Sequence, residues 1–184
     1  TPVVPSFINI ISSNFDTPPS VRVNPNGTDW WDEITRAAPT SNLSLSMRSG
    51  NERSKSYLSL GFLSREGVLE YNSFNRVNIQ LNNEFKSGND KFKVGQHLNV
   101  AYSKSNGGNN AAVENAVRST PLLPVYDESG NFSGTYSNSN GLSNNENPFS
   151  LLYRAQDNYN KNIRIFGDVY ASYAILDELT FKTT

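Results

Sequence analysis

Residues 91–103, KFKVGQHLNVAYS, decide how the rest of this sequence is interpreted. The apolar side chains of Phe92, Val94, Leu98, Val100 and Tyr102 alternate with polar ones such as Lys93, His97 and Asn99. Successive side chains of a β-strand point to opposite faces, so this stretch predicts a strand with one apolar and one polar face.

The same alternation recurs on both sides of this stretch. It covers 42–48, 56–64, 77–82 and 163–173, and a short last strand is expected around Leu179 and Phe181. Segments of about ten residues with this period are typical of the wall of a transmembrane β-barrel. The sequence therefore predicts an all-β fold, an antiparallel meander of about six strands with long external loops that carry short helices.

The connections between the expected strands alternate in length. Those near 49–54, 86–91 and 176–178 are short, whereas those at 65–75 and 104–161 are long. In an antiparallel meander alternate links lie at the same end, as in bacterial outer-membrane barrels with short periplasmic turns and long external loops. The alternative is a soluble β-sandwich with one large insertion.

Composition limits the possible functions. The 184 residues carry a formal net charge of −1, which gives no basic field for nucleic acid. Cysteine is absent, so disulfides and thiolate metal sites are excluded, and no cofactor is indicated. Asparagine and serine are abundant, as suits loops and a hydrated lumen. Because a free-standing barrel needs about eight strands, six predict a piece of a larger protein or a soluble domain.

The expected organisation has four parts. Residues 1–41 form an irregular lead-in and an external loop with a short helix, 42–103 form four barrel strands, 104–161 form a long external loop, and 162–184 form two further strands. Thr28 or Asp29 is expected to cap the short helix, which runs through Ile34.

The long connection is expected to hold further structure of its own. Residues 111–118 predict a second helix with Val113, Ala116 and Val117 on one side. YDESGNFSG (126–134) predicts a small hairpin that turns at Ser129 and Gly130. Residues 136–147 have the Asn/Ser/Gly-rich composition of a mobile segment.

Five ordered blocks carry a resemblance to a known family. They are GTDWWDEITRAAP (27–39), NLSLSMRSGNERSKSYLSLGFLSREGVLEYNSFNR (42–76), KFKVGQHLNVAYSKSN (91–106), AVRSTPLLPVYDESGNFSG (116–134) and NPFSLLYRAQDNYNKNIRIFGDVYASYAILDELTFKT (147–183). Together they resemble the SusC/RagA-like family of TonB-dependent outer-membrane transporters. One departure is Met47–Gly50, where the family pattern leads us to expect a plainer turn of small residues.

The resemblance implies a barrel fragment in the bacterial outer membrane. It implies early strands of a barrel of about 22 strands, closed by an N-terminal plug. It further implies import of oligosaccharides or peptides together with a SusD-like surface lipoprotein, driven by the TonB complex through N-terminal parts that lie outside these residues. A soluble carbohydrate-binding β-sandwich is the alternative, motivated by the Asn content and the paired tryptophans.

Trp30 and Trp31 are the first ligand-binding candidates, beside Asp32 and Glu33. Aromatic rings can stack on sugars while carboxylates bind hydroxyl groups. The alternative has one Trp packing the helix and the other at the membrane interface. It is favoured because adjacent helix positions do not face the same way. For the same reason Asp32 and Glu33 do not form the convergent acid pair of a glycosidase.

No enzyme is indicated by the remaining polar residues. His97 has no cysteine or nucleophile motif with which to build a metal site or a triad. Asp127, Glu128 and Asn131 lack the ligand spacing of an EF-hand and are interpreted as turn residues.

The polar strand faces supply the other candidates. If the apolar faces meet lipid, then a hydrated interior is lined by Asn78, Gln80, Asn82, His97, Asn99, Arg164 and Asp168. Neutral amides there can bind a polar solute or anchor the plug, and plug contact is favoured for most of them. The predicted ligand-binding residues are Trp30, Trp31, Asn78, Gln80, Asn99 and Tyr126, with no catalytic and no metal residue.

Overall fold

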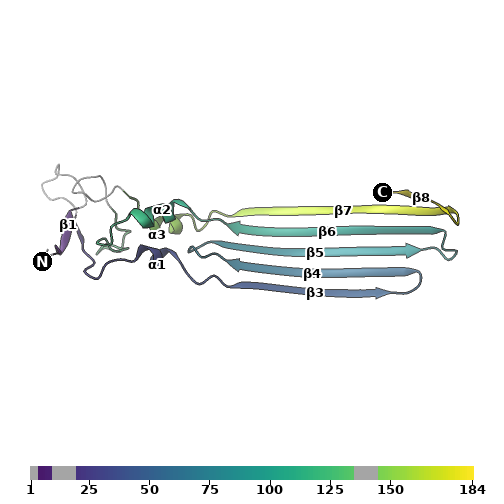
Figure 1. Ribbon diagram of the computed structural model, residues 1–184, viewed down its shortest axis with the longest axis horizontal. Coiled ribbons are helices and arrows are strands. Elements are labelled where there is room, and N and C mark those ends of the chain that lie inside the picture. Colours follow the sequence, from purple (N-terminus) through teal and green to yellow (C-terminus); the bar gives the residue numbers. More distant parts are fainter. Residues whose placement is uncertain (1–3, 10–19, 135–144) are drawn as a thin grey trace. The chain divides into compact units, whose positions relative to one another are not determined.

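The computed structural model describes residues 4–9, 20–134 and 145–184. The chain divides into two compact units, which are considered separately (Figure 1). The sheet unit comprises Pro39–Glu66, Ser73–Ser105 and Tyr159–Thr184, and the loop unit comprises Thr1–Ala38, Gly67–Asn72 and Asn106–Asn158. Within the described ranges, no helix has the length and apolar character that crossing a membrane requires.

The sheet unit is a single antiparallel sheet whose strands follow one another in sequence order (Figure 1). Its six strands are β3 (Thr40–Gly50), β4 (Ser54–Glu66), β5 (Ser73–Lys86), β6 (Phe92–Asn106), β7 (Asn160–Leu176) and β8 (Leu179–Thr183). The predicted all-β meander of six strands is therefore confirmed.

Strand register gathers the apolar side chains on one face. Leu45 lies opposite Leu60, which lies opposite Ile79, and Val100 lies opposite Ile165 on the other half of the sheet. The side chains of this face stay exposed to a large degree, 68% for Leu45 and for Ile165. A β-sandwich buries this face under a second sheet, and no such sheet covers it among the described residues.

Side chains of asparagine build the short turns. Asn51 Oδ1 accepts hydrogen bonds from the backbone N–H groups of Arg53 and Ser54, at 2.9 and 2.8 Å. Asn89 Oδ1 accepts from the backbone N–H of Lys91 at 3.3 Å in the turn between β5 and β6. These local acceptors help to close the β3–β4 and β5–β6 hairpins, which explains part of the high Asn content.

In the described part of the loop unit there are three helices and a two-stranded sheet. The helices are α1 (Trp30–Ile34), α2 (Ala111–Arg118) and α3 (Pro148–Arg154), and the strands are β1 (Phe7–Asn9) and β2 (Ser20–Arg22). Asp29 caps α1 through the N–H groups of Trp31 and Asp32, as predicted. Asn147 caps α3 in the same manner, and Pro148 fits the first helical position because its missing N–H has no partner to lose there.

A hydrophobic core holds the three helices together. Each helix contributes buried side chains, among them Ile34 from α1, Ala112 from α2 and Leu152 from α3. Arg36 ties the 67–72 segment to this core, since its Nη2 donates to the carbonyl of Asn72 at 3.0 Å and its Nε lies 3.7 Å from Glu70 Oε2. These long connections thus form a folded unit of their own.

Three details of the loop unit differ from the expectations. The lead-in contains the β1–β2 pair, and α3 is an additional helix. Helix α2 has the predicted bounds but buries Ala112 and Ala116, so the inclusion of Val117 in the packed face is wrong: its side chain is 77% exposed. Residues 136–144 of the segment expected to be mobile lie outside the described residues.

We expect Leu152→Ala to destabilise the loop unit by about 2–5 kcal/mol, because this fully buried side chain leaves a cavity among the three helices. Hydrogen exchange of the backbone amides in α1 and α2 measures the loss. Val117→Ala is the matched control, since that side chain is exposed, and equal effects of the two variants would contradict the assigned core.

Candidate functional site

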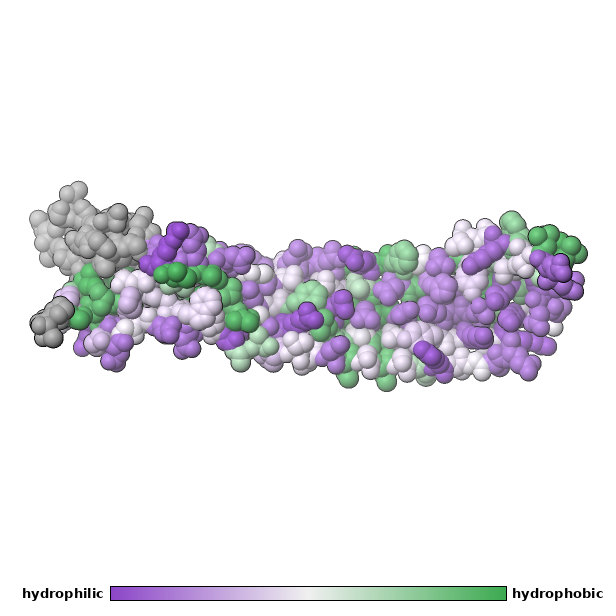
Figure 2. All heavy atoms as spheres, in the orientation of Figure 1, coloured by the Kyte–Doolittle hydropathy of each residue, from purple (hydrophilic) through white to green (hydrophobic). Residues whose placement is uncertain are grey.

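The polar face of the sheet brings most of the predicted strand residues together. A hollow of about 500 Å³ on this face is lined by Gln80, Asn82, His97, Leu98, Asn99, Arg164, Phe166 and Asp168. Asn78 lies on the same face, where its amide occupies the space left by Gly61 on β4, and it does not line the hollow. Figure 2 shows hydrophilic residues over much of one face of the sheet, most densely toward the short turns.

A network of polar and aromatic side chains lies on this face toward the short turns. Tyr170 donates a hydrogen bond from its hydroxyl to Glu84 Oε2 at 2.9 Å, and Lys93 Nζ lies 3.5 Å from the same oxygen. His97 Nδ1 lies 3.2 Å from both carboxylate oxygens of Asp168. The His97 ring also stacks on Tyr170, with ring centroids 5.6 Å apart.

Glu84 and Tyr170 were not among the residues predicted from the sequence. Both lie at positions of β5 and β7 whose side chains point to the polar face. Strand alternation alone could therefore have placed them on the same face as His97 and Asp168. Gly95 makes their contact possible. It is buried directly opposite Tyr170, and a Cβ at this position would overlap the tyrosine ring. A glycine inside a strand is here the sign of a large neighbouring side chain.

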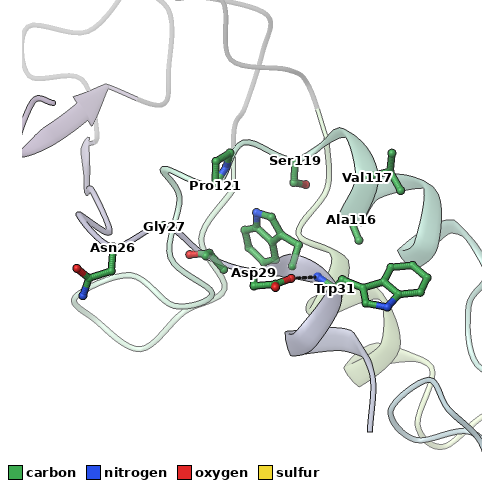
Figure 3. A pocket seen from close by; sticks show the side chains of 10 residues that line it. Asn26, Gly27, Asp29, Trp31, Ala116, Val117, Ser119 and Pro121 are labelled. Atoms are coloured by element: carbon green, nitrogen blue, oxygen red, sulfur yellow. Dashed lines mark hydrogen bonds between the residues drawn. The ribbon is translucent and has the colours of Figure 1, made fainter. Parts of the chain in front are cut away.

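A second hollow lies in the loop unit, where α1 and α2 meet (Figure 3). Its volume is about 460 Å³, and Trp30, Trp31, Ala116, Val117 and Pro121 supply much of its lining. Trp30 is buried and Trp31 is exposed, in agreement with the expectation that neighbours on a helix do not share a face.

Trp30 is part of the core, whereas Trp31 is available at the surface. The exposed fraction of Trp30 is 4%, and its Nε1 donates to the carbonyl of Thr120 at 2.9 Å. Trp31 is 53% exposed at the edge of the hollow. The ring of Trp30 packs in the core of the loop unit, as the favoured alternative expected of one tryptophan, and Trp31 alone of the pair presents an exposed aromatic surface. Ligand binding by these tryptophans stays a prediction.

Polar groups around this hollow are largely used by the fold. Thr28 Oγ1 donates to the carbonyl of Leu123 at 2.6 Å, and Asp29 Oδ1 accepts from Trp31 and Asp32 at the start of α1. The hollow therefore presents mainly apolar and aromatic surface and few free polar groups. Such a surface suits binding through apolar and stacking contacts.

Tyr126, the last predicted ligand residue, lies in the expected hairpin. It forms an isolated antiparallel bridge with Phe132 and stacks on that ring at 5.3 Å between centroids. Its side chain remains 48% exposed. One face of the ring is consequently used for packing, and the remaining surface is free for contact.

The tip of this hairpin is held by Asp127. Its Oδ1 accepts from the backbone N–H groups of Ser129 and Asn131 at 2.9 and 2.8 Å, while Gly130 adopts a left-handed φ of 82°. The hydrogen bond from the Asn131 backbone is the main cause that lowers the pKa of this carboxyl, followed by those from the Asn131 side chain, Ser129 and Gly130, against partial desolvation. These contacts agree with a turn residue. Among the described residues no group of His, Asp and Glu side chains is arranged to hold a metal.

Comparisons with known proteins point to one group. TonB-dependent receptor P3 of Formosa agariphila is 30% identical, and the alignment covers 87% of this chain and 16% of that receptor. TonB-dependent receptor P39 of the same organism is 27% identical, with 85% and 14% covered. No family model matches the sequence.

Solved structures agree with the sequence relatives. A chain of the RagAB peptide importer in its closed-closed state superposes with a TM-score of 0.61 at 19% identity, over 85% of this chain and 18% of that one. The open-open state gives the same TM-score at 20% identity. The chain belongs to the TonB-dependent receptors.

This TonB-dependent receptor sequence spans 14% to 16% of the relatives named above, so it corresponds to a piece of the barrel. The resemblance to the SusC/RagA-like family inferred from the five blocks agrees with the fold of the RagAB structures. The relatives are named as receptors rather than as enzymes, in line with the absence of a catalytic motif from the sequence.

We expect the hairpin at Asp127 to loosen in acid. Because the folded-state pKa lies below the ordinary 3.8, the ionised carboxylate stabilises the turn above that pH, and this contribution is lost as the pH falls through the lower value. Amide NMR shifts of labelled Gly130 and Asn131, followed from pH about 6 to about 2, report the transition. Its midpoint should lie below 3.8, and Asp127→Asn should abolish it; a midpoint at or above 3.8 would contradict the assignment.

Proposed function

We propose that this chain is a stretch of barrel wall in an outer-membrane transporter. The transporter imports oligosaccharides or peptides with a SusD-like surface lipoprotein and takes energy from the TonB complex through parts outside these residues. The main support is the single-layer sheet with one exposed apolar face, together with the TonB-dependent receptor relatives.

The charge distribution of the apolar face supports contact with lipid. Among the strand residues of this face only Glu66, Lys104 and Lys161 are charged, and all three lie at the strand ends where the long links attach. The stretch from Phe92 to Tyr102 is about ten residues, or roughly 33 Å at 3.3 Å per residue. At a tilt of about 45° it rises by about 23 Å, close to the apolar band of about 25 Å in an outer-membrane barrel.

The edges of the sheet support a continuing barrel. The outer edge of β3 has no partner strand among the described residues, and β8 pairs only with the last part of β7, from Ala171 to Leu176. Unpaired backbone N–H and C=O groups are unfavourable in hydrocarbon, so a membrane location requires neighbouring strands at both edges.

The remaining candidate residues take roles that follow from their faces. Asn78, Gln80 and Asn99 line the lumen, where their amides contact the plug and a passing solute. Trp31 and Tyr126 belong to the loop unit, which lies outside the cell and contacts the solute or the lipoprotein. Trp30 supports Trp31 from within the core.

The soluble carbohydrate-binding sandwich is the weaker proposal. Its hydrophobic core would have to cover Leu45, Ile79 and Ile165, and these side chains have no second sheet above them in the described structure. Such rows of exposed apolar side chains are unfavourable in water and favourable in a bilayer.

We expect Ile79→Lys in the full-length receptor to lower the free energy of unfolding in lipid vesicles by about 2–4 kcal/mol, because the charge enters hydrocarbon. Ser46→Lys is the control. Ser46 directly follows Leu45 of the same apolar row but faces the opposite side, so a much smaller loss is expected. Equal losses in denaturant titrations would reject the assignment of the lipid face.

We expect the loop unit to be accessible from outside the cell. The chain has no cysteine, so single cysteines placed in a Cys-free full-length receptor give unambiguous labelling. Val117→Cys should react with a membrane-impermeant maleimide on intact cells. Glu52→Cys, in the exposed turn between β3 and β4, should react only after the outer membrane is permeabilised. The reverse pattern would invert the proposed orientation.

A further inference from the structure

The two faces of the sheet differ in charge as well as in hydropathy. Glu84 and Asp168 are the only acidic residues among the strand positions of the polar face in the described structure. The basic residues of this face, assigned by strand register and alternation, are Arg48, Lys55, Arg65, Arg76, Lys86, Lys93, Arg164 and Lys182. The whole chain has a net charge of −1. The excess of positive charge on this face therefore comes from which residues point to it, and not from the overall composition.

The two carboxylates leave most of this positive charge unneutralised. Asp168 faces His97, and Glu84 is engaged by Tyr170 and by Lys93. Arg48 lies over the ring of Tyr57 and Lys182 over the ring of Tyr170, at 5.2 and 4.6 Å from the ring centroids. Glu84 has two cations of this face beside it, since Lys93 forms an ion pair with it and Lys55 lies directly opposite it on β4.

Two residues of the polar-face hollow stand out from its neutral amides. Phe166 of β7 lies directly opposite Asn99, and its side chain points to the polar face. The residue is 74% exposed. Arg164 precedes it by one step on the same face and is exposed, without an ion pair or hydrogen bond to any described residue. Gln80 and Asn99 line the same hollow. A cation, an apolar ring and amides are thus presented together, beside the Asp168 carboxylate, which lines the same hollow and faces His97.

We propose that this hollow is a subsite for a solute that carries carboxylate groups. This inference rests on the proposed transport function and adds the chemical class of its substrate. Arg164 pairs with a carboxylate, Phe166 supports the adjoining sugar ring or aliphatic chain, and the amides of Gln80 and Asn99 bind neutral polar groups. The surrounding cations raise the local concentration of an anionic solute inside the lumen.

The test uses calorimetric titration of the purified full-length receptor in detergent. Three probes of similar length are compared: a linear tetra-uronate, a tetra-glutamate peptide and a neutral tetrasaccharide. One or both anionic probes should bind more tightly than the neutral one, and this preference should shrink as the salt concentration rises. Which anionic probe binds identifies the source of the carboxylate.

Arg164→Gln should weaken binding of the anionic probe about tenfold, equivalent to about 1.4 kcal/mol, whereas Arg164→Lys should retain much of the affinity. Lys161→Gln is the matched control, because it removes the same charge from the same strand but on the opposite face. Phe166→Ala should reduce binding of a uronate more than that of a peptide, since a sugar ring offers the larger stacking surface.

Two outcomes would overturn the subsite. One is binding of the neutral probe that is as tight as that of the anionic probes. The other is an Arg164→Gln variant that binds the anionic probe normally while its barrel unfolds at lower denaturant concentration, which would assign Arg164 to plug contact. Neither result affects the lipid-face test at Ile79, so failure of this inference is distinguishable from failure of the proposed function.

Discussion

The structure depends on a sheet that satisfies its backbone hydrogen bonds within one layer and leaves its apolar face uncovered. Strand pairing fixes the register, and the register decides that Leu45, Leu60 and Ile79 form one row. Shifting one strand by a single residue would transfer its apolar side chains to the polar face. A bilayer can cover the apolar face without a second protein layer, and for this reason so thin a unit is compatible with a folded protein.

Strand period and capping residues made much of this fold predictable from the sequence. Alternation located the six strands because one face is apolar and the other polar along nearly their whole length. The start of α1 was predictable because Asp29 can accept hydrogen bonds from the first free N–H groups of a helix. Asn147 followed by Pro148 carries an equivalent signal for α3, which a search for caps could have found.

What could not be predicted depends on contacts between distant segments. The helical pattern of α2 does not reveal that small Ala112 and Ala116 are buried while Val117 is exposed, because that depends on how closely α1 and α3 approach. Trp30 is fixed by a carbonyl 90 residues away, at Thr120. The contact of Tyr170 with Glu84 spans 86 residues and also needs the absence of a side chain at Gly95. Such details belong to tertiary packing, which local patterns do not encode.

The two faces of the strands are subject to different constraints. Positions that meet hydrocarbon tolerate little except apolar side chains, because a charge there costs a few kcal/mol. Variation that selects a solute is therefore concentrated on the polar face and in the loop unit. In the polar-face hollow Phe166 is an exposed aromatic ring, and Arg164 beside it is an exposed cation next to the amides of Gln80 and Asn99. Contact with a ligand would remove the Phe166 ring from water while Arg164 pairs with a charge, so the proposed subsite would place chemical selectivity on β7.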